Sequence, residues 1–476
     1  MKHYKLFIDG NWIDTPNKAF VQDKYTGEPF ASIAQAEDAD VERAVQSAKN
    51  AFQKIKLSPY HRYEILFKVS KLLLENKEHI AEILSREVGK PLKESRGEVQ
   101  RAAFTFEIAA EEAKRITGEM VPVEATPGSE NRLAFTLRSP LGVVCAITPF
   151  NFPLNLAAHK IAPALAAGNA VVLKPTQQCP VNSALLVQLL LDAGLPPGYI
   201  NLVFGSGAKV GEQLLHSKDI NFYSFTGSAQ VGERIRDVIG LRNCTLELGS
   251  NSAVIVHHDA DIMDTSRLCV AGSLANAGQV CISVQRVYVH QDIYNEFLSE
   301  MKKQVEKLVV GNPLDDKTDM GPMISEKEVE RIDQWVKEAV RQGAEVVTGG
   351  RKMNERTYLP TILTNVTREM KVVSNEVFAP VVVVIPYENI DWAISEINAS
   401  QYGLQAGVFT SNINLAMKAA KEIHTGGVVI GDTSSYRTDS MPYGGVKRSG
   451  IGKEGAKYAI KELTEEKIVI FNLKNQ

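Results

Sequence analysis

From residue 139 onward, short β-prone runs alternate along the chain with amphipathic or apolar helical stretches. The runs are Val143–Ile147, Ala170–Leu173, Ile200–Phe204 and Phe222–Phe225. Strands separated by helices are typical of βαβ units, which build a parallel sheet covered by helices. The alternation therefore predicts a doubly wound α/β fold, in which ligands bind beyond the carboxyl ends of the strands.

A second series of β-prone runs follows residue 250. Its members are Ala253–Val256, Arg286–Val289, Val381–Ile385, Val408–Phe409 and Gly427–Ile430. A chain of 476 residues is too long for one core and predicts roughly three structural units. We therefore expect two α/β domains, with the first hundred residues mainly helical. Asp40 is expected to cap one helix there, and Ser58-Pro59 to begin the next.

Two further β-prone runs have no neighbouring partner in the sequence. They are Arg132–Leu137 and Lys467–Leu473. Unpaired strand edges promote aggregation, so such runs need a partner. We expect these two to pair with each other or with another subunit.

Composition and charge exclude several classes of function. The chain carries 53 Lys and Arg against 56 Asp and Glu, a formal net charge of -3. Nucleic acid is therefore not expected as a partner, because no global positive field attracts phosphate backbones. The first ten residues become polar too early for a secretory segment, and prolines interrupt the most apolar stretch, 141–158. We expect no membrane association and a cytoplasmic location.

The five cysteines are Cys145, Cys179, Cys244, Cys269 and Cys281. They are odd in number, widely spaced and contain no C-x-x-C pair, which disfavours a disulfide framework and a structural zinc site. No metal is expected, and at least one thiol is free for chemistry.

Distinctive polar residues follow the predicted strands of the first domain. Asn151 lies between two prolines in Thr148–Pro153, where a rigid loop is expected. Its amide suits an oxyanion site, and the alternative, which this segment alone favours, is an Asn that satisfies the backbone of its own loop. Lys174 ends the next strand and can reach a ribose or phosphate, or simply be solvated.

Two glycine-containing turns each follow a strand and open a helix. They are Gly205–Gly211 and Thr226–Gly232. Such turns direct backbone N–H groups at a phosphate, but neither has the G-x-G-x-x-G pattern, so each alone is weak evidence.

Glu247 and Cys281 are the two candidates for covalent and acid–base chemistry. Glu247 stands in the apolar Leu246-Glu247-Leu248-Gly249, where desolvation raises a carboxyl pKa toward that of a general base. Cys281 follows Gly278-Gln279-Val280 in a turn before a strand, where local donors can make a thiol nucleophilic. A structural Glu and an inert buried Cys are the alternatives.

These segments, taken in order, resemble the aldehyde dehydrogenase superfamily over nearly the whole chain. The resemblance runs from Phe7–Trp12 to Pro442–Gly450 and includes Leu173–Pro175, Phe225–Ser228, Glu247–Gly249, Gly278–Cys281 and Glu376–Pro380. It implies a Rossmann-type cofactor domain (1–117 and 138–247) and an α/β catalytic domain (248–448). A small β bridging domain (118–137 and 449–476) would make a homodimer or homotetramer.

The resemblance also implies roles for individual residues. Cys281 attacks the aldehyde, Asn151 holds the oxyanion, and Glu247 activates the water that hydrolyses the thioester. The cofactor, NAD or NADP, would contact residues from several loops, namely Thr148, Pro149, Lys174, Gln177, Gly207, Gly211, Phe225, Thr226, Gly227, Ser228, Leu248, Gly249, Glu376 and Phe378.

Two positions depart from the commonest family pattern. Ser250 replaces a second Gly after Glu247-Leu248-Gly249 and is expected to perturb that loop. Gln177 stands where NAD-preferring relatives often carry Glu. A carboxylate repels a 2′-phosphate and a neutral amide does not, so NADP is expected to be accepted.

The nearest resemblance is to the branch of lactaldehyde and non-phosphorylating glyceraldehyde-3-phosphate dehydrogenases, through Phe152–Leu156, His159–Pro163 and Tyr436–Asp439. It implies a short 2-hydroxyaldehyde such as lactaldehyde, glyceraldehyde-3-phosphate or sulfolactaldehyde, with Phe152, Ile282, Arg101 and Arg437 on the substrate side. An arginine fork suits an anionic tail, and a structural salt bridge is the alternative for both arginines. Val280 replaces an Arg of the phosphate-binding enzymes, which weakens the case for a phosphate.

Two other functions stay open. A CoA-acylating dehydrogenase would pass the acyl group to CoA, but Glu247 favours water as the acceptor. A catalytically silent dinucleotide-binding structural protein would not need Cys281, Asn151 and Glu247 together.

Overall fold

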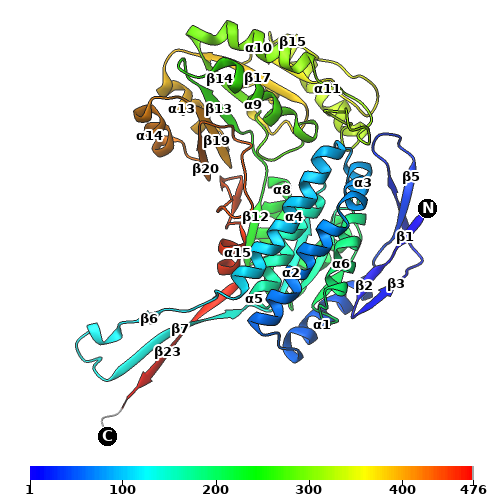
Figure 1. Ribbon diagram of the computed structural model, residues 1–476, viewed down its shortest axis with the longest axis vertical. Helices are drawn as coiled ribbons and strands as arrows, with labels where there is room; N and C mark the ends of the chain where they lie inside the picture. The colour runs from blue at the N-terminus through cyan, green and yellow to red at the C-terminus, as the bar shows by residue number, and fades with distance from the viewer. Residues whose placement is uncertain (474–476) are drawn as a thin grey trace.

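The computed structural model describes residues 1–473 and contains two large sheets (Figure 1). The first sheet has eight strands in the order β22-β12-β11-β8-β9-β10-β2-β3. Its bounds are β22 Gly450–Ile451, β12 Asn243–Glu247, β11 Phe222–Thr226, β8 Val143–Thr148, β9 Ala170–Pro175, β10 Ile200–Leu202, β2 Leu6–Ile8 and β3 Asn11–Ile13. The five central strands run parallel. The four strands predicted between residues 143 and 225 are all present.

Helices cover this sheet and bury it. They are α1 Asp38–Lys54, α2 Pro59–Glu75, α3 Lys77–Val88, α4 Leu92–Ala113, α5 Pro153–Ala167, α6 Val181–Asp192, α7 Glu212–His216 and α8 Ala229–Ile239. Every residue of α5 is buried, because α5 packs against β8 and β9 and lies beneath α2 and α4. The polar side chains of α5 must therefore find partners inside the protein.

The second sheet has seven strands in the order β15-β16-β17-β14-β13-β19-β20. Their bounds are β15 Glu345–Thr348, β16 Thr361–Thr364, β17 Val381–Tyr387, β14 Arg286–His290, β13 Ala253–Val256, β19 Gln405–Phe409 and β20 Gly427–Ile430. The helices of this half are α9 Ile262–Leu274, α10 Tyr294–Glu306, α11 Glu326–Arg341, α12 Lys371–Ser374, α13 Ile390–Asn398 and α14 Ile413–Glu422. Every pair except β15–β16 is parallel. This confirms the predicted second α/β series.

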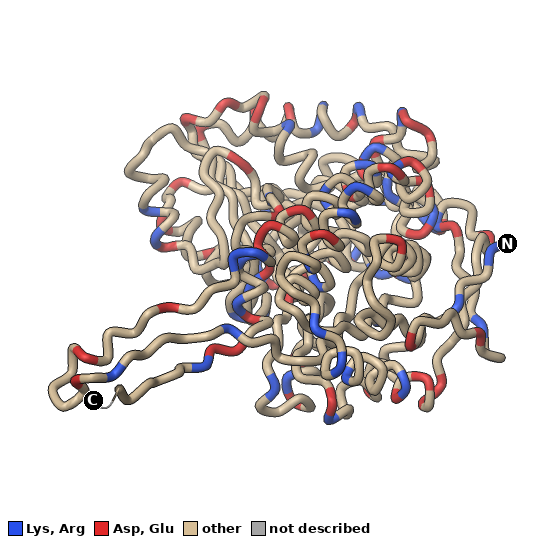
Figure 2. The backbone as a smooth tube through the Cα atoms, turned by 60° about the horizontal axis from the view of Figure 1, so that its bottom comes forward, with Lys and Arg blue, Asp and Glu red and all other residues tan. Residues whose placement is uncertain are grey.

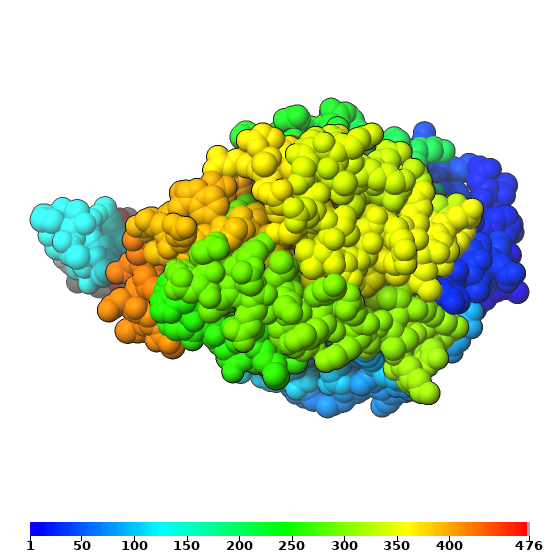
Figure 3. Space-filling view, turned by 90° about the horizontal axis from the view of Figure 1, so that it is seen from above, coloured from blue at the N-terminus to red at the C-terminus, as the bar shows by residue number. Residues whose placement is uncertain are grey.

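A three-stranded arm projects from the body (Figures 1 and 3). It contains β6 Met120–Val121, β7 Arg132–Pro140 and β23 Thr464–Asn472, with β7 in the middle. β23 runs antiparallel to β7, with Ile468 opposite Thr136. The predicted pairing of the two orphan runs is confirmed.

The predicted C-terminal segment of the bridging domain begins too early. Gly450–Ile451 pairs with β12 in the first sheet, and α15 (Ala456–Glu462) packs on α5. Only 464–472 joins the arm, because Ala456, Ala459, Ile460 and Leu463 are buried in the core of the first domain. The last residues of the predicted segment, 474–476, lie outside the described residues.

The N-terminal region is less helical than expected. The pairs β2–β3 and β4–β5, with β1, form strands before the first helix; the remaining bounds are β1 Lys2–Tyr4, β4 Lys18–Gln22 and β5 Pro29–Ala34. Glu37, not Asp40, is the N-cap of α1, and Asp40 completes a capping box with it. Ser58 caps α2 with Pro59 at the first helical position, as predicted.

Positive and negative residues are intermingled over the backbone (Figure 2). This distribution agrees with the near balance of charges in the sequence. Within residues 1–473, no helix combines the length and the apolar character needed to cross a membrane.

Candidate active site

The carboxyl ends of the parallel strands of the first sheet bring four predicted residues to one edge. Thr148 ends β8, Lys174 is the penultimate residue of β9, Thr226 ends β11, and Glu247 ends β12. Thr226 and Glu247 are register partners on adjacent strands. The loops that carry ligand-binding residues in such sheets begin here.

Cys281 lies in a strained turn between the short helical segment Ala275–Gly278 and β14. Asn276 and Ala277 have φ of 49° and 54°, and Gly278 has a φ of 71°. A Cβ on Gly278 would lie 2.1 Å from the carbonyl oxygen of Ala379, so the turn requires glycine. Cys281 is partly exposed, whereas the other four cysteines are buried.

The Cys281 Sγ lies 3.1 Å from the Tyr443 hydroxyl. Burial of the site raises the pKa of the Cys281 thiol to about 11, while the Tyr443 hydrogen bond and the charge of Arg437 act in the opposite direction. The thiol is thus protonated at rest near neutral pH. Its conversion to a nucleophile needs a base and groups that stabilise the thiolate.

Asn151 lies in the loop between β8 and α5 and is 3% exposed. Its carbonyl oxygen accepts a 3.2 Å hydrogen bond from the Asn276 side chain, which ties this loop to the Cys281 turn. The Asn151 Oδ1 is buried and has no hydrogen-bond partner within the described part of the chain. The side chain is therefore not consumed by its own loop.

Glu247 is 3% exposed, and both carboxyl oxygens lack a hydrogen-bond partner within residues 1–473. A Cβ on Gly444 would lie 2.9 Å from Glu247 Oε1, so the glycine leaves room for the Glu247 carboxyl beside this loop. Burial, and then the charge of Glu454, raise the pKa of Glu247 well above its usual value. A carboxyl with a raised pKa is, once ionised, a stronger base than a solvated carboxylate, which is the property expected of a general base that acts near neutral pH.

Arg437 is buried at the same place and links several of these groups. Its Nη2 donates to Glu454 Oε2 at 2.9 Å, and its guanidinium carbon lies 3.7 Å from the centroid of the Tyr443 ring. Lys160 on α5 also pairs with Glu454, at 3.1 Å. The Arg437 Nε is buried without a partner among the described residues, so one donor of the fork is left over.

Arg101 is placed differently from Arg437. Its Nε and Nη2 donate to the two carboxyl oxygens of Asp439 at 3.2 and 2.8 Å. Asp439 also lies 2.8 Å from His159 Nε2 and accepts from Asn155 Nδ2 at 3.2 Å. The structure therefore shows Arg101 as one half of a bridge between α4 and the loop that carries Arg437.

The two apolar substrate-side candidates also have defined surroundings. Ile282 is buried and packs with Leu404 and Tyr443 next to Cys281. Phe152 directly precedes α5, with the Lys90 ammonium 3.9 Å from its ring centroid.

Several candidate cofactor residues carry buried polar groups that lack partners or stay free to bind. The hydroxyls of Thr148 and Thr226 are buried without a hydrogen-bond partner in the described chain. Lys174 is buried, which lowers the pKa of its ammonium to about 8, and its Nζ donates a long 3.4 Å hydrogen bond to the carbonyl of Pro175. A Cβ on Gly211 would come only within 3.8 Å of Lys174.

Glu376 and Phe378 meet the loop that follows Glu247. Glu376 Oε1 accepts from the Ser250 N–H at 2.9 Å, and burial raises the pKa of Glu376 to about 7. A Cβ on Gly249 would lie 2.4 Å from Glu376 Oε2, so a side chain at position 249 would displace the Glu376 carboxyl. Phe378 has a φ of 49° and contacts Phe150 edge-on at 5.7 Å, next to Pro149. Ser250 does not adopt a positive φ, so its side chain causes no backbone strain.

The remaining cofactor candidates lie at the starts of helices or at the ends of strands of the first sheet. Ser228 caps α8, and Ser206 caps the π-helical turn Gly207–Gly211. Phe225 packs beside Gly227, and Leu248 fills the space left by Gly232 of α8. Gln177 donates from Nε2 to Gln35 Oε1 at 2.6 Å. Hydroxyls, backbone N–H groups, an ammonium and a carboxyl at one sheet edge fit the riboses and phosphates of a dinucleotide.

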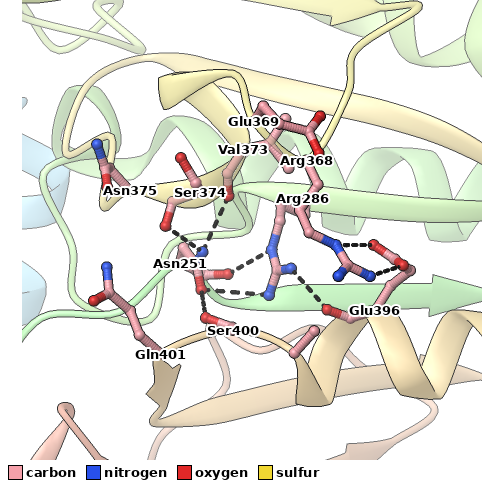
Figure 4. A pocket seen from close by; sticks show the side chains of 11 residues that line it. Asn251, Arg286, Arg368, Glu369, Val373, Ser374, Asn375, Glu396, Ser400 and Gln401 are labelled. Carbon is pink, nitrogen blue, oxygen red and sulfur yellow. Dashed lines mark hydrogen bonds and ion pairs between the residues drawn. The ribbon is translucent and has the colours of Figure 1, made fainter.

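A separate cavity of about 320 Å³ is lined in part by Asn251 (Figure 4). Arg286 donates there to the Asn251 carbonyl at 2.9 Å, and Arg368 pairs with Glu396. None of the predicted site residues lines this cavity. Within residues 1–473, no group of three or more His, Cys, Asp or Glu side chains is placed to hold a metal ion.

Sequence reasoning missed the buried partners of the site. The contact between Tyr443 and Cys281 joins residues 162 positions apart. Asp439 and Arg101 are 338 positions apart, and Glu454 and Lys160 are 294 positions apart. The one signal in the sequence for such a partner was Tyr443 in the glycine-rich Pro442–Gly445, because a tyrosine hydroxyl that becomes buried needs a hydrogen-bond partner.

Comparisons with known proteins agree with this geometry. The family model described as "Aldehyde dehydrogenase family" matches residues 12–469. The 3-sulfolactaldehyde dehydrogenase of Priestia aryabhattai is 56% identical over 99% of each chain, and the lactaldehyde dehydrogenase of Methanococcus maripaludis is 40% identical over 98% of this chain and 100% of its own. The glyceraldehyde-3-phosphate dehydrogenase of Methanocaldococcus jannaschii, solved with NADP, superimposes with a TM-score of 0.92 at 38% identity, over 96% of this chain and 100% of its own. The chain belongs to the aldehyde dehydrogenase family.

Proposed function

We propose that this enzyme oxidises a short 2-hydroxyaldehyde with an anionic tail to its carboxylic acid, with 3-sulfolactaldehyde as the first candidate. One observation carries the proposal: the partly exposed Cys281 thiol lies beside a buried arginine, Arg437, whose Nε has no partner among the described residues. The 56% identity to a 3-sulfolactaldehyde dehydrogenase supports a sulfonate as the tail. Val280 in place of an arginine makes a phosphate a weaker candidate.

The reaction begins at the sulfur of Cys281. The partly exposed thiol releases its proton to water, the resulting thiolate forms a bond to the aldehyde carbon, and the carbonyl electron pair moves to the oxygen. The Asn151 amide and the Cys281 backbone N–H stabilise that oxyanion, a contribution of about 3 to 4 kcal/mol for one donor in a preorganised site. When bound, NAD(P) supplies the hydride acceptor that leaves a thioester on Cys281.

Glu247 completes the reaction. Its carboxylate takes a proton from water as the water oxygen attacks the thioester carbon, and the carbon–sulfur bond then breaks. The buried setting that raises the pKa of Glu247 makes its carboxylate basic enough for this step. A carboxylic acid is released and the Cys281 sulfur is regenerated.

Arg437 is proposed to recognise the tail. Arg437→Gln is expected to raise KM for 3-sulfolactaldehyde by about 10- to 100-fold, because a charge-assisted hydrogen bond contributes about 1.5 to 3 kcal/mol. The KM for neutral lactaldehyde, measured with the same variant, should change far less. Equal effects on the two aldehydes would remove Arg437 from the tail site. Arg101 is proposed only as the residue that holds the Asp439 loop, and Phe152 and Ile282 as apolar walls.

NADP is proposed to be accepted alongside NAD because Gln177 is neutral. Gln177→Glu is expected to raise KM for NADP about tenfold and leave KM for NAD nearly unchanged, since a carboxylate repels the 2′-phosphate. The neighbouring Gln35 can turn its unpaired Nε2 toward the new carboxylate, so the fold tolerates the change. Gln178→Glu adds the same charge at an exposed position and is the control. Parallel changes for both cofactors would place Gln177 away from the 2′-phosphate.

The CoA-acylating alternative makes a different product. We expect a free acid, with no acceleration by CoA, because Glu247 is the proposed base for water and its carboxyl oxygens have no hydrogen-bond partner within the described residues. Product analysis with and without CoA separates the two reactions, and an acyl-CoA product would overturn this part of the proposal.

The arm is proposed to contact a second copy of the chain. Its apolar side chains Leu133, Leu137, Ile468, Ile470 and Phe471 are exposed in the single chain. Covering them is favourable, and an exposed β-sheet arm is otherwise an aggregation liability. Light scattering should give at least twice the 52.3 kDa of one chain, and a single-chain mass would contradict the proposal.

A cytoplasmic location is also proposed, supported by five cysteines that are all free of disulfides.

A further inference from the structure

Tyr443 reaches the reactive sulfur from a distant part of the chain. It lies between β20 and β21 (Val446–Lys447), and its hydroxyl is 3.1 Å from Cys281 Sγ. The side chain is 3% exposed, so this hydroxyl faces the thiol rather than bulk water. Within the described residues, the thiol is its one hydrogen-bond partner.

The backbone of Tyr443 is held firmly. Its N–H donates to the Glu454 carbonyl at 3.2 Å, and the Glu454 N–H donates to the Tyr443 carbonyl at 2.7 Å. The ring packs with Ile282 and Leu404 on one side of the site. The hydroxyl is therefore preorganised, and little entropy is lost when it donates.

The direction of the hydrogen bond follows from the chemistry of the two groups. Burial raises the pKa of the Tyr443 phenol well above its ordinary value, so the phenol keeps its proton at neutral pH. When Cys281 is a thiolate, it can only accept. Tyr443 then donates to a charged sulfur, and such bonds are roughly twice as strong as neutral ones.

Arg437 strengthens the same donor. Its guanidinium lies over the ring of Tyr443, with 3.7 Å between the guanidinium carbon and the ring centroid. A cation over the ring withdraws electron density from it and favours negative charge nearby. The residue proposed to bind the substrate tail is thus in contact with the residue that faces the sulfur.

We propose that Tyr443 is a further catalytic residue, which donates a hydrogen bond to the Cys281 sulfur whenever that sulfur is negative. This occurs twice in the cycle: before the sulfur attacks the aldehyde, and when the carbon–sulfur bond of the thioester breaks and the sulfur takes the electron pair. No proton is transferred, because the phenol keeps its own. The inference rests on the proposed role of Cys281 as nucleophile.

The test is the rate at which iodoacetamide alkylates Cys281, followed by peptide mass spectrometry across pH in the full chain without aldehyde. Tyr443→Phe removes one atom and the donor. Alkylation of Cys281 near pH 8 is expected to slow by about tenfold or more, with its pH midpoint moved upward, because a hydrogen bond to a charge is lost. Tyr358→Phe is the matched control, since Tyr358 is buried and its hydroxyl has no partner in the described chain.

The second measurement uses protein in which every tyrosine is replaced by a fluorinated tyrosine. This protein keeps the shape of the side chain, so it serves as the test if Tyr443→Phe does not fold. A more acidic phenol donates more strongly, so the midpoint of Cys281 alkylation should move downward. An unchanged alkylation profile in Tyr443→Phe, or an unchanged midpoint with the fluorinated residue, would overturn the inference. Either result would leave the proposed function intact as long as Cys281→Ser is inactive, so the two failures can be told apart.

Discussion

Cys281→Ser is expected to lower kcat/KM for every aldehyde by on the order of 10⁴-fold or more, to the limit of detection. A serine hydroxyl in this site is a far weaker nucleophile than a thiolate, and no base here is strong enough to ionise it. Cofactor binding should persist, because the predicted cofactor residues lie on the strand ends and loops of the first sheet. Steady-state rates and a fluorescence titration with NADPH measure the two effects separately.

Cys244→Ser is the matched control for this substitution. It makes the same atomic change on β12, the strand that ends at Glu247. Its activity should stay within about twofold of the parent, since Cys244 is buried and is not one of the predicted site residues. Sustained turnover by Cys281→Ser would mean that another group attacks the aldehyde.

Glu247→Gln is expected to leave thioester formation with hydride transfer intact and to stop hydrolysis of the thioester. One equivalent of reduced cofactor should appear in a burst, after which turnover falls by about 10²- to 10⁴-fold, the usual contribution of a general base. Because burial raises the pKa of Glu247, the parent enzyme should lose deacylation as the pH falls through that raised value. The variant should lack this acidic limb. Stopped-flow absorbance of the reduced nicotinamide records both phases.

Hydroxylamine gives this prediction a direct check. It cleaves thioesters without a protein base, so it should restore turnover to Glu247→Gln but not to Cys281→Ser. Glu465→Gln, on the exposed arm, is the charge-matched control and should behave like the parent. A variant at Glu247 with no burst and no rescue would place this carboxyl before, not after, hydride transfer.

Much of the fold follows from local sequence pattern. The runs Ala253–Val256 and Gly427–Ile430 match β13 and β20 to the residue, because each is apolar and bounded by polar or glycine-containing turns. The early strands were not predicted, because β1 and β2 are only three residues long; β1 pairs with β5, and β2 pairs with β3 and with the distant β10. Local pattern carries no information about such partners.

The candidate site divides in the same way. Cys281, Glu247 and Asn151 stand out because each follows a strand or turn in a distinctive local setting. The groups that adjust their chemistry, such as Tyr443 and Glu454, reach them only through the tertiary fold. Residue type alone could not distinguish the roles of the two arginines. Arg101 donates from two nitrogens to Asp439, whereas the Arg437 Nε has no partner within the described chain.

In the proposed reaction, the acyl group of the substrate becomes covalently attached to Cys281. Intact-mass and peptide mass spectrometry of Glu247→Gln, quenched in acid after mixing with NADP and the aldehyde, tests it most directly. One acyl group per chain is expected, located on the peptide that contains Cys281. An acyl group on a different residue, or an unmodified chain in which the burst of reduced cofactor has occurred, would contradict it.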